Sequence, residues 1–253
     1  MTCNRLRIPS RFLRNPAEII LLIPGKGANR NAPEKCLLFF HGAGENPQTI
    51  LDNSPLADLA ETWNLRIVLP FVGNSFGLDC GEGERYHAFL SKELIPRLGD
   101  ALFATAGKTG SFRIGGISMG AYIALQLGLE RRELISGIFS ISGAYDLRKA
   151  ARFGRVCGLE IPPIVAELEA RPGECARRLL ERYAGGGAPP LYFACGNGDL
   201  FYDTNRMAAD WAQELKYSVR WKDRPGLHNW DYWREALPSV LQWAAMTGGS
   251  YGK

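Results

Sequence analysis

Long apolar runs and runs of a single charge are both missing from this sequence of 253 residues. The apolar run Ile19 to Ile23 is stopped by Pro24 and Gly25, and a helix needs about 20 apolar residues to span a bilayer. The 30 basic and 26 acidic residues are dispersed, which argues against a nucleic-acid or membrane-surface partner. Residues 1–14 lack the apolar stretch and cleavage site of a signal peptide, so we expect a cytoplasmic protein.

Cysteine pairs with metal-ligand spacing are also missing. None of the six cysteines forms a CxxC pair, and their spacing does not suit a structural zinc site. Disulfide frameworks are typical of small secreted domains, and this chain is much longer than those. We therefore expect mostly buried thiols and no metal centre.

A nucleotide-binding loop is excluded on similar grounds. Residues 106–109 read Ala-Gly-Lys-Thr and resemble the end of a P-loop. However, Leu102 stands where the first glycine of that motif should be, and the segment leads into a predicted strand instead of a helix. We expect no organic cofactor.

Short apolar runs alternate with helical patterns along the chain. We predict strands at 17–23, 36–40, 65–69, 112–117, 135–142, 190–195 and 217–222, and helices at 49–62, 86–104, 119–128, 203–216 and 230–246. Continuously apolar strands are typical of a mainly parallel sheet that helices cover on both faces. The sequence therefore predicts one α/β domain over residues 1–253.

The segment 147–187 interrupts this alternation. It contains Pro162-Pro163 and the triplet Gly185-Gly186-Gly187, which break regular structure. We predict a cap-like insertion with short helices, and the alternative is a plain crossover connection with a long loop.

The pentapeptide Gly116-Ile117-Ser118-Met119-Gly120 matches the G-x-S-x-G nucleophile elbow. In that motif the serine lies on a tight turn between a strand and a helix, so the residues two before and two after it need to lack side chains. The pattern is common by itself, but here a predicted strand precedes it and a predicted helix follows. We infer that Ser118 is a catalytic nucleophile.

Histidine is scarce, which narrows the search for the general base that a serine nucleophile needs. Of the three histidines, His41 begins a glycine-rich loop after a predicted strand, and His87 lies within a predicted helix. His228 follows the last predicted strand, where α/β hydrolases carry their histidine. The sequence therefore predicts His228 as the base.

The acidic member of such a triad is expected between Ser118 and His228, after the strand at 190–195. The loop that follows offers Asp199 and Asp203. Asp199 is nearer to the strand end, whereas Asp203 has the position of a helix N-cap. We favour Asp199, whose role would be to hold the imidazole tautomer and stabilise the imidazolium.

Two main-chain amides are expected to stabilise the oxyanion. One is the N–H of Met119, at the start of the helix after the nucleophile. The other should come from the loop His41-Gly42-Ala43-Gly44, because glycine lets a backbone approach the substrate closely. Ala43 is the preferred donor in that loop and Gly44 the alternative.

With these residues placed, the chain resembles the α/β-hydrolase esterase family that includes tributyrin esterases, S-formylglutathione hydrolases (esterase D), feruloyl esterases and mycolyltransferases. The resemblance is carried by residues 38–46, 69–76, 86–96, 115–122 and 228–233. It implies the α/β-hydrolase fold and a Ser118–Asp199–His228 triad. The tributyrin-type esterases are the most similar members, although Phe76-Gly77 replaces a Trp-Tyr pair that is frequent in the family.

From these features we expect a serine carboxylesterase that hydrolyses small, short-acyl esters through an acyl-enzyme on Ser118. The alternatives are a thioester hydrolase of the S-formylglutathione type and a catalytically silent hydrolase fold used for binding. The expected partner is a small-molecule ester, and a homo-oligomer is compatible with the sequence.

Overall fold

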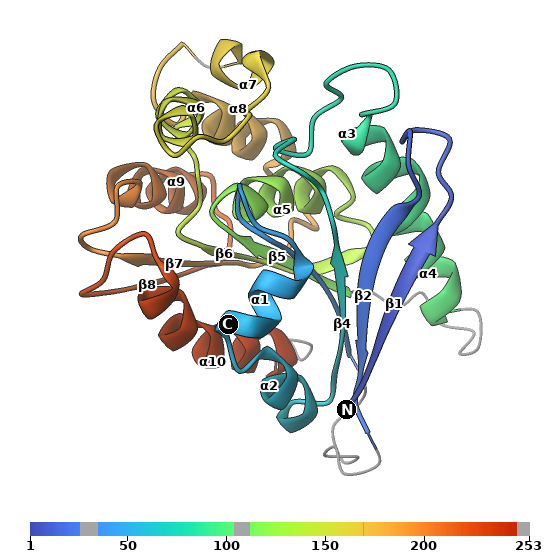
Figure 1. Cartoon of the computed structure of the whole chain (residues 1–253). Helices are drawn as coiled ribbons and strands as arrows, with labels where there is room; N and C mark the ends of the chain where they lie inside the picture. The colour runs from blue at the N-terminus through green and yellow to red at the C-terminus, as the bar shows by residue number, and fades with distance from the viewer. Residues whose placement is uncertain (26–34, 104–111, 169, 247–253) are drawn as a thin grey trace.

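The computed structural model describes residues 1–25, 35–103, 112–168 and 170–246 (Figure 1). The P-loop-like residues 106–109 and Ala104, the predicted end of one helix, lie outside these ranges. No helix of the described part is long and apolar enough to cross a membrane.

An eight-stranded sheet forms the centre of the described structure, in the order β1-β2-β4-β3-β5-β6-β7-β8. Its strands are β1 (Thr2–Ile8), β2 (Ala17–Ile23), β3 (Lys35–Phe40), β4 (Leu65–Pro70), β5 (Phe112–Ile117), β6 (Ile135–Ile141), β7 (Leu191–Gly196) and β8 (Val219–Arg224). β2 pairs antiparallel with β1 and β4, and all other neighbours are parallel. The carboxyl ends of β3, β5, β7 and β8 therefore meet at one edge of the sheet.

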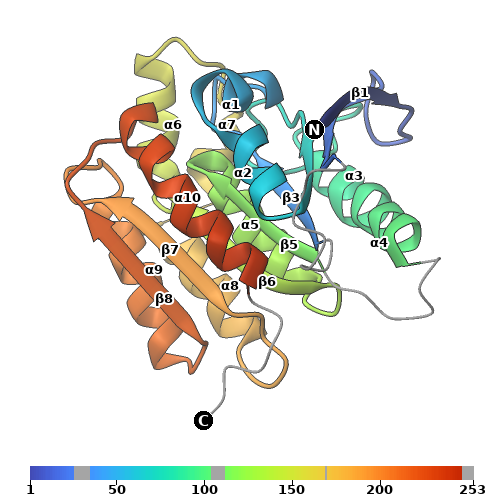
Figure 2. The ribbon, with the colours of Figure 1, turned by 90° about the horizontal axis from the view of Figure 1, so that it is seen from below.

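Helices cover both faces of this sheet. They are α1 (Pro47–Asn53), α2 (Leu56–Thr62), α3 (Tyr86–Phe89), the π-helical turn η1 (Leu90–Leu94), α4 (Ile95–Phe103), α5 (Met119–Glu130), α6 (Leu147–Val156), α7 (Pro163–Glu167), α8 (Glu174–Tyr183), α9 (Tyr202–Glu214) and α10 (Trp230–Met246). Side chains of α1, α2 and α10 belong to one apolar core, and those of α4, α5, α8 and α9 to another. The view from below shows α10 lying on one face of the sheet, beside β7 (Figure 2).

The strand β3 shows why the apolar runs are continuous. Leu38 and Phe40 belong to one core, whereas Leu37 and Phe39 belong to the other. Successive side chains of a strand point to opposite faces, so a sheet covered on both sides needs apolar residues at every position. The predicted fold class, an α/β-hydrolase sheet with helices on both faces, is confirmed.

Three local expectations differ from the structure. The strand β1 was not predicted, and its side chains are mostly exposed, so it lacks an apolar pattern. The helix predicted at 49–62 is two helices, α1 and α2, separated at Ser54 and Pro55. Asp203 is not an N-cap, because α9 begins at Tyr202 and Phe201 is its N-cap residue.

The described residues of the segment 147–187 form three helices with different surroundings. Helix α8 packs against α5 and α9, as a helix that covers the sheet does. Helices α6 and α7 pack against each other above the sheet, at the top left of Figure 1. A role as a cap therefore concerns α6 and α7 and stays a prediction.

Candidate active site

Ser118 lies at a strained turn between β5 and α5. Its φ of 55° and ψ of −116° lie in a region that residues with a side chain rarely adopt. A Cβ on Gly116 would lie 2.3 Å from the main chain of Gly120, and a Cβ on Gly120 would lie 2.4 Å from the Phe40 carbonyl oxygen. The absence of side chains on these two glycines therefore lets the turn close. Ser118 lies at the carboxyl edge of the sheet, and 8% of its surface is exposed.

The structure brings His228 between Ser118 and Asp199. The Nε2 atom of His228 lies 2.9 Å from the Ser118 Oγ atom, and its Nδ1 atom lies 3.0 and 2.9 Å from the two carboxylate oxygens of Asp199. The three residues follow β5, β7 and β8, whose carboxyl ends meet at the same edge. A serine, an imidazole and a carboxylate in this order can move a proton away from the serine hydroxyl.

The Asp199 carboxylate is held in its charged form. Burial raises its pKa, but hydrogen bonds from His228 and from the main-chain N–H of Phe201, at 2.8 Å, outweigh burial and lower the pKa below its usual value. Asp199 is therefore an anion that accepts from the Nδ1–H of His228, which leaves Nε2 free of a proton and facing Ser118.

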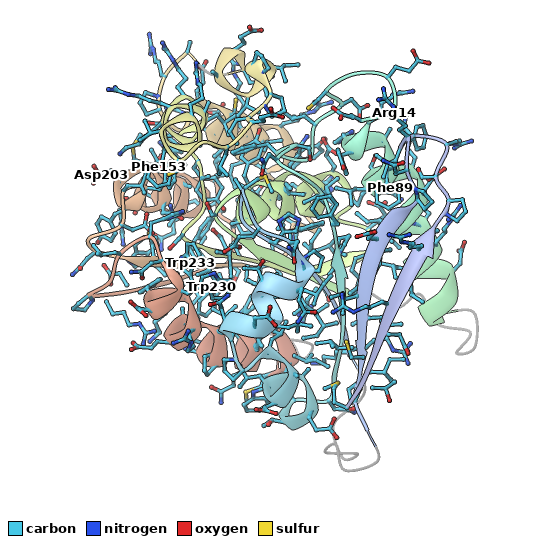
Figure 3. The ribbon with its side chains drawn as sticks, viewed as in Figure 1. Arg14, Phe89, Phe153, Asp203, Trp230 and Trp233 are labelled. Atoms are coloured by element: carbon cyan, nitrogen blue, oxygen red, sulfur yellow. The ribbon has the colours of Figure 1, made fainter. Side chains whose placement is uncertain are left out.

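Asp203, the alternative acid, has a different position. It lies in the first turn of α9 and its side chain is exposed. Figure 3 shows Asp203 at the outer edge of the molecule, whereas Trp230 and Trp233 lie further inside, at the start of α10.

Trp233 contacts the His228 ring edge-on, with 5.0 Å between the ring centroids.

The glycine-rich loop at residues 41–44, called the oxyanion loop from here on, follows β3 and reaches the same edge. The N–H of Gly42 donates to the Glu45 Oε2 atom at 3.0 Å, and the N–H of Gly44 donates to the Asn74 Oδ1 atom at 2.8 Å. Between them, the N–H of Ala43 has no hydrogen-bond acceptor among the described residues. The Gly44 amide is therefore occupied, and the Ala43 amide is available.

The direction of the Ala43 N–H follows from the preceding carbonyl. The Gly42 carbonyl oxygen accepts from the His41 Nδ1–H at 2.8 Å and from the Glu45 N–H at 3.3 Å. In a trans peptide the C=O and the next N–H point in opposite directions. The Ala43 N–H therefore points away from these groups, and Ala43 lines the same pocket as Ser118.

The second expected donor lies at the start of α5. The N–H of Met119 has no acceptor within the described part of the chain, as expected for the first residue of a helix. Met119 directly follows Ser118, and the positive end of the helix dipole lies at this point. The site therefore offers two unoccupied amides, those of Ala43 and Met119, close to the serine.

A small, mostly apolar cavity opens beside Ser118 and His228, with a volume of about 150 Å³. Phe76, Phe153, Leu159, Phe201 and Trp233 contribute its larger apolar side chains. Phe153 and Leu159 come from α6 and the segment after it, and Figure 3 shows Phe153 on that side. Such a cavity suits a small apolar group next to the serine.

The other two histidines have partners of their own. His41 is fully buried, and its Nε2 atom accepts a hydrogen bond from the Val72 N–H at 3.1 Å. The His87 Nε2 atom lies 2.7 Å from a carboxylate oxygen of Glu130, at the far end of α5. Neither ring is hydrogen-bonded to Ser118.

The sequence points to residues 41–44 as a candidate loop, but not to the side chains that hold it. Asn74 also donates from Nδ2 to the carbonyl of Glu160 at 3.2 Å, which connects the loop with the segment between α6 and α7. Glu45 connects the loop with Trp230 at the start of α10. Both residues lie in stretches that carry the family resemblance, 38–46 and 69–76, but no local pattern indicates contacts between such distant segments.

Comparisons with known proteins agree on one family. The Esterase family model, described as "Putative esterase", matches residues 74–244. An acetyl esterase of Caldicellulosiruptor saccharolyticus is 24% identical over 265 residues, which cover 96% of this chain and 98% of that protein.

Two solved structures from Staphylococcus aureus have a similar fold. One is fluorophosphonate-binding serine hydrolase F (FphF), with a TM-score of 0.76 and 19% identity. The other is the S-formylglutathione hydrolase FrmB, with a TM-score of 0.77 and 19% identity. Each comparison covers 96% of this chain and 98% of the other.

Proposed function

The chain belongs to the Esterase family and is a serine hydrolase that acts on carboxylic esters, and we propose that Ser118 is its nucleophile, His228 its general base and Asp199 the carboxylate that orients His228. The observation that carries this proposal is the distance of 2.9 Å between the Ser118 Oγ and His228 Nε2 atoms beside an open cavity. The buried Asp199 anion supports it, since it favours the imidazolium that forms when His228 takes the proton.

In the first half of the reaction, the Ser118 oxygen attacks the ester carbonyl carbon while its proton moves to His228 Nε2. The carbonyl oxygen gains a negative charge, which the N–H groups of Ala43 and Met119 stabilise. The tetrahedral intermediate then collapses, the bond to the alcohol oxygen breaks, and His228 gives its proton to the leaving alcohol. Ser118 now carries the acyl group.

In the second half, water takes the place of the alcohol. His228 accepts a proton from the water as the water oxygen attacks the acyl carbon, and the same two amides hold the oxyanion. When the bond to the Ser118 oxygen breaks, His228 returns its proton to Ser118. The carboxylic acid leaves, and the enzyme is in its starting state.

The size of the cavity indicates the substrate class. A cavity of about 150 Å³ holds an apolar group of roughly the size of benzene, or about six carbon atoms. We therefore propose short-acyl esters as substrates, with the acyl group in this cavity. Because Phe153, Gly154 and Leu159 line it, we also propose that α6 and the segment after it form a cap over the acyl group.

The test combines labelling with a substrate series. A fluorophosphonate probe is expected to label the folded protein once, at Ser118, and the Ser118→Ala variant not at all. Among p-nitrophenyl esters, kcat/KM should be highest for acyl groups of about two to six carbons and fall for longer ones. Absence of labelling at Ser118 would refute the proposed nucleophile. Faster turnover of S-formylglutathione than of any oxygen ester would assign the enzyme to thioesters.

A further inference from the structure

Glu45 lies in the wall of the active-site cavity, directly after the oxyanion loop. Each of its two carboxylate oxygens accepts one hydrogen bond, Oε2 from the Gly42 N–H at 3.0 Å and Oε1 from the Trp230 Nε1–H at 2.7 Å. The Glu45 N–H also donates to the Gly42 carbonyl oxygen at 3.3 Å. Glu45 is therefore hydrogen-bonded to the N–H and the carbonyl of Gly42 and to the side chain of Trp230, the first residue of α10.

The contacts with Gly42 fix the peptide that carries the Ala43 N–H. Glycine tolerates many backbone conformations, so Gly42 by itself leaves the direction of that peptide open. Glu45 restrains the N–H and the carbonyl of Gly42, and a Cβ on Gly42 would lie 3.0 Å from Glu45 Oε2. The main-chain N–H of Glu45 thus holds the peptide that carries the Ala43 N–H, and the Glu45 carboxylate holds the peptide before it, so that both peptides next to Gly42 are fixed.

The contact with Trp230 reaches the histidine. Trp230 follows His228 by two residues and packs edge-on against Trp233, with 5.3 Å between the ring centroids. Trp233 in turn packs against the His228 ring. Glu45 therefore connects the loop that carries the proposed oxyanion donor with the segment that carries the proposed base.

We propose that Glu45 is a positioning residue that holds the Ala43 amide and the His228 segment in the arrangement that the transition state needs; this rests on the proposed roles of Ser118, His228 and Ala43. The carboxylate is suited to this because one group with two oxygens accepts from two different segments at once. A glutamine has one acceptor oxygen and a donor amide, so it can satisfy only one of the two partners.

The first experiment compares Glu45→Gln with wild type, using p-nitrophenyl acetate as substrate and a trifluoromethyl ketone, which forms an oxyanion on Ser118, as inhibitor. We expect kcat to fall by about 10- to 100-fold, below the loss of about 10²–10³ for removing a whole oxyanion donor. KM should stay within about twofold, because the substrate carbonyl binds before the charge develops. The inhibition constant of the ketone should rise by the same factor as kcat falls.

A matched control is Glu130→Gln, which removes a half-buried carboxylate that pairs with His87, away from the cavity. Its kcat, KM and ketone affinity should equal those of wild type. Unfolding midpoints for both variants separate a loss of stability from a loss of catalysis. If Glu45→Gln lowers the midpoint but leaves kcat and ketone affinity within about twofold of wild type, Glu45 is only structural and the proposal is wrong.

A second variant, Trp230→Phe, removes the indole N–H but keeps an aromatic ring. It should show a smaller loss in kcat than Glu45→Gln with unchanged KM, because it breaks one of the two side-chain contacts of Glu45. The losses in the double variant with Glu45→Gln should be less than additive, because both changes affect the same contact. Fully additive losses would overturn the proposal. Titration of active sites with fluorophosphonate distinguishes a failure of the proposed function from a failure of the proposed role of Glu45. If wild type is not labelled, Ser118 is not the nucleophile. If the variants are labelled and have wild-type kinetics, only the role of Glu45 is refuted.

Discussion

The stability of the fold should depend on the protonation of His41. This ring is fully buried and lies flat against Phe71, with 5.6 Å between the ring centroids. Its Nδ1–H donates to the Gly42 carbonyl, and its Nε2 atom accepts from the Val72 N–H. A second proton would have to sit on Nε2, where it would face another N–H. Burial therefore lowers the pKa of His41 from 6.5 to about 4.

The size of the effect follows from these two pKa values. Between pH 6.5 and about pH 4 the unfolded chain binds a proton at His41 that the folded chain does not bind, so the free energy of unfolding falls as the pH falls. The difference is worth about 3 kcal/mol in full, and about 2 kcal/mol is already lost at pH 5. Above pH 7 the contribution of His41 is complete and no longer changes with pH.

Urea unfolding of wild type and His41→Gln at several pH values between 4 and 8 tests this. Glutamine offers an uncharged acceptor to the Val72 N–H, and both proteins share all other titrating groups. We expect the stability difference between wild type and variant to shrink by about 2 kcal/mol between pH 8 and pH 5. Parallel stability curves for the two proteins would refute the reasoning, because His41 would then bind protons equally in both states.

Two further predictions concern the triad and the elbow. Asp199→Asn should lower kcat by about 10⁴, while Asp203→Asn, a matched change in the first turn of α9, should keep near-wild-type kcat for p-nitrophenyl acetate; the reverse result would move the acid to Asp203. Gly120→Ala should abolish labelling of Ser118 and lower the unfolding midpoint, because its Cβ would lie 2.4 Å from the Phe40 carbonyl oxygen. A fully active, equally stable Gly120→Ala protein would show that the turn does not need this glycine.

Strands with two buried faces were the easiest elements to predict. In β3 and β5 every position but Lys35 is buried, and such short apolar runs indicate strands without knowledge of their neighbours. The strand β1 lies at the edge of the sheet and buries almost nothing, so its sequence resembles that of a loop. It is ordered by pairing with all seven residues of β2, a contact that its own residues do not indicate.

The break between α1 and α2 shows a limit of periodicity. Apolar residues on both sides of the break, Ile50 in α1 and Leu56 and Ala60 in α2, are buried in the same core, so the stretch as a whole resembles one amphipathic helix. Pro55 lacks an N–H and disfavours a helical residue before it, so the helix ends there. The proline therefore outweighs the apolar pattern, which continues on both sides of it.

The candidate triad could be derived because topology places its members. Ser118, Asp199 and His228 each follow a strand of the parallel part of the sheet, and the carboxyl ends of those strands meet at one edge. Any side chains in these three positions would come close together. The choice between Asp199 and Asp203 needed only the distance of each from the end of β7.

The orientation of the peptides in the oxyanion loop could not be predicted in the same way, because glycine adopts many backbone conformations. The direction of the Ala43 N–H depends on His41, Glu45 and Asn74, and Glu45 depends on a tryptophan 185 residues further along the chain. The sheet is compatible with several orientations of this loop, and such contacts fix one of them. Changes at Glu45 should therefore alter turnover more than the stability of the fold, whereas changes at the elbow glycines should alter both.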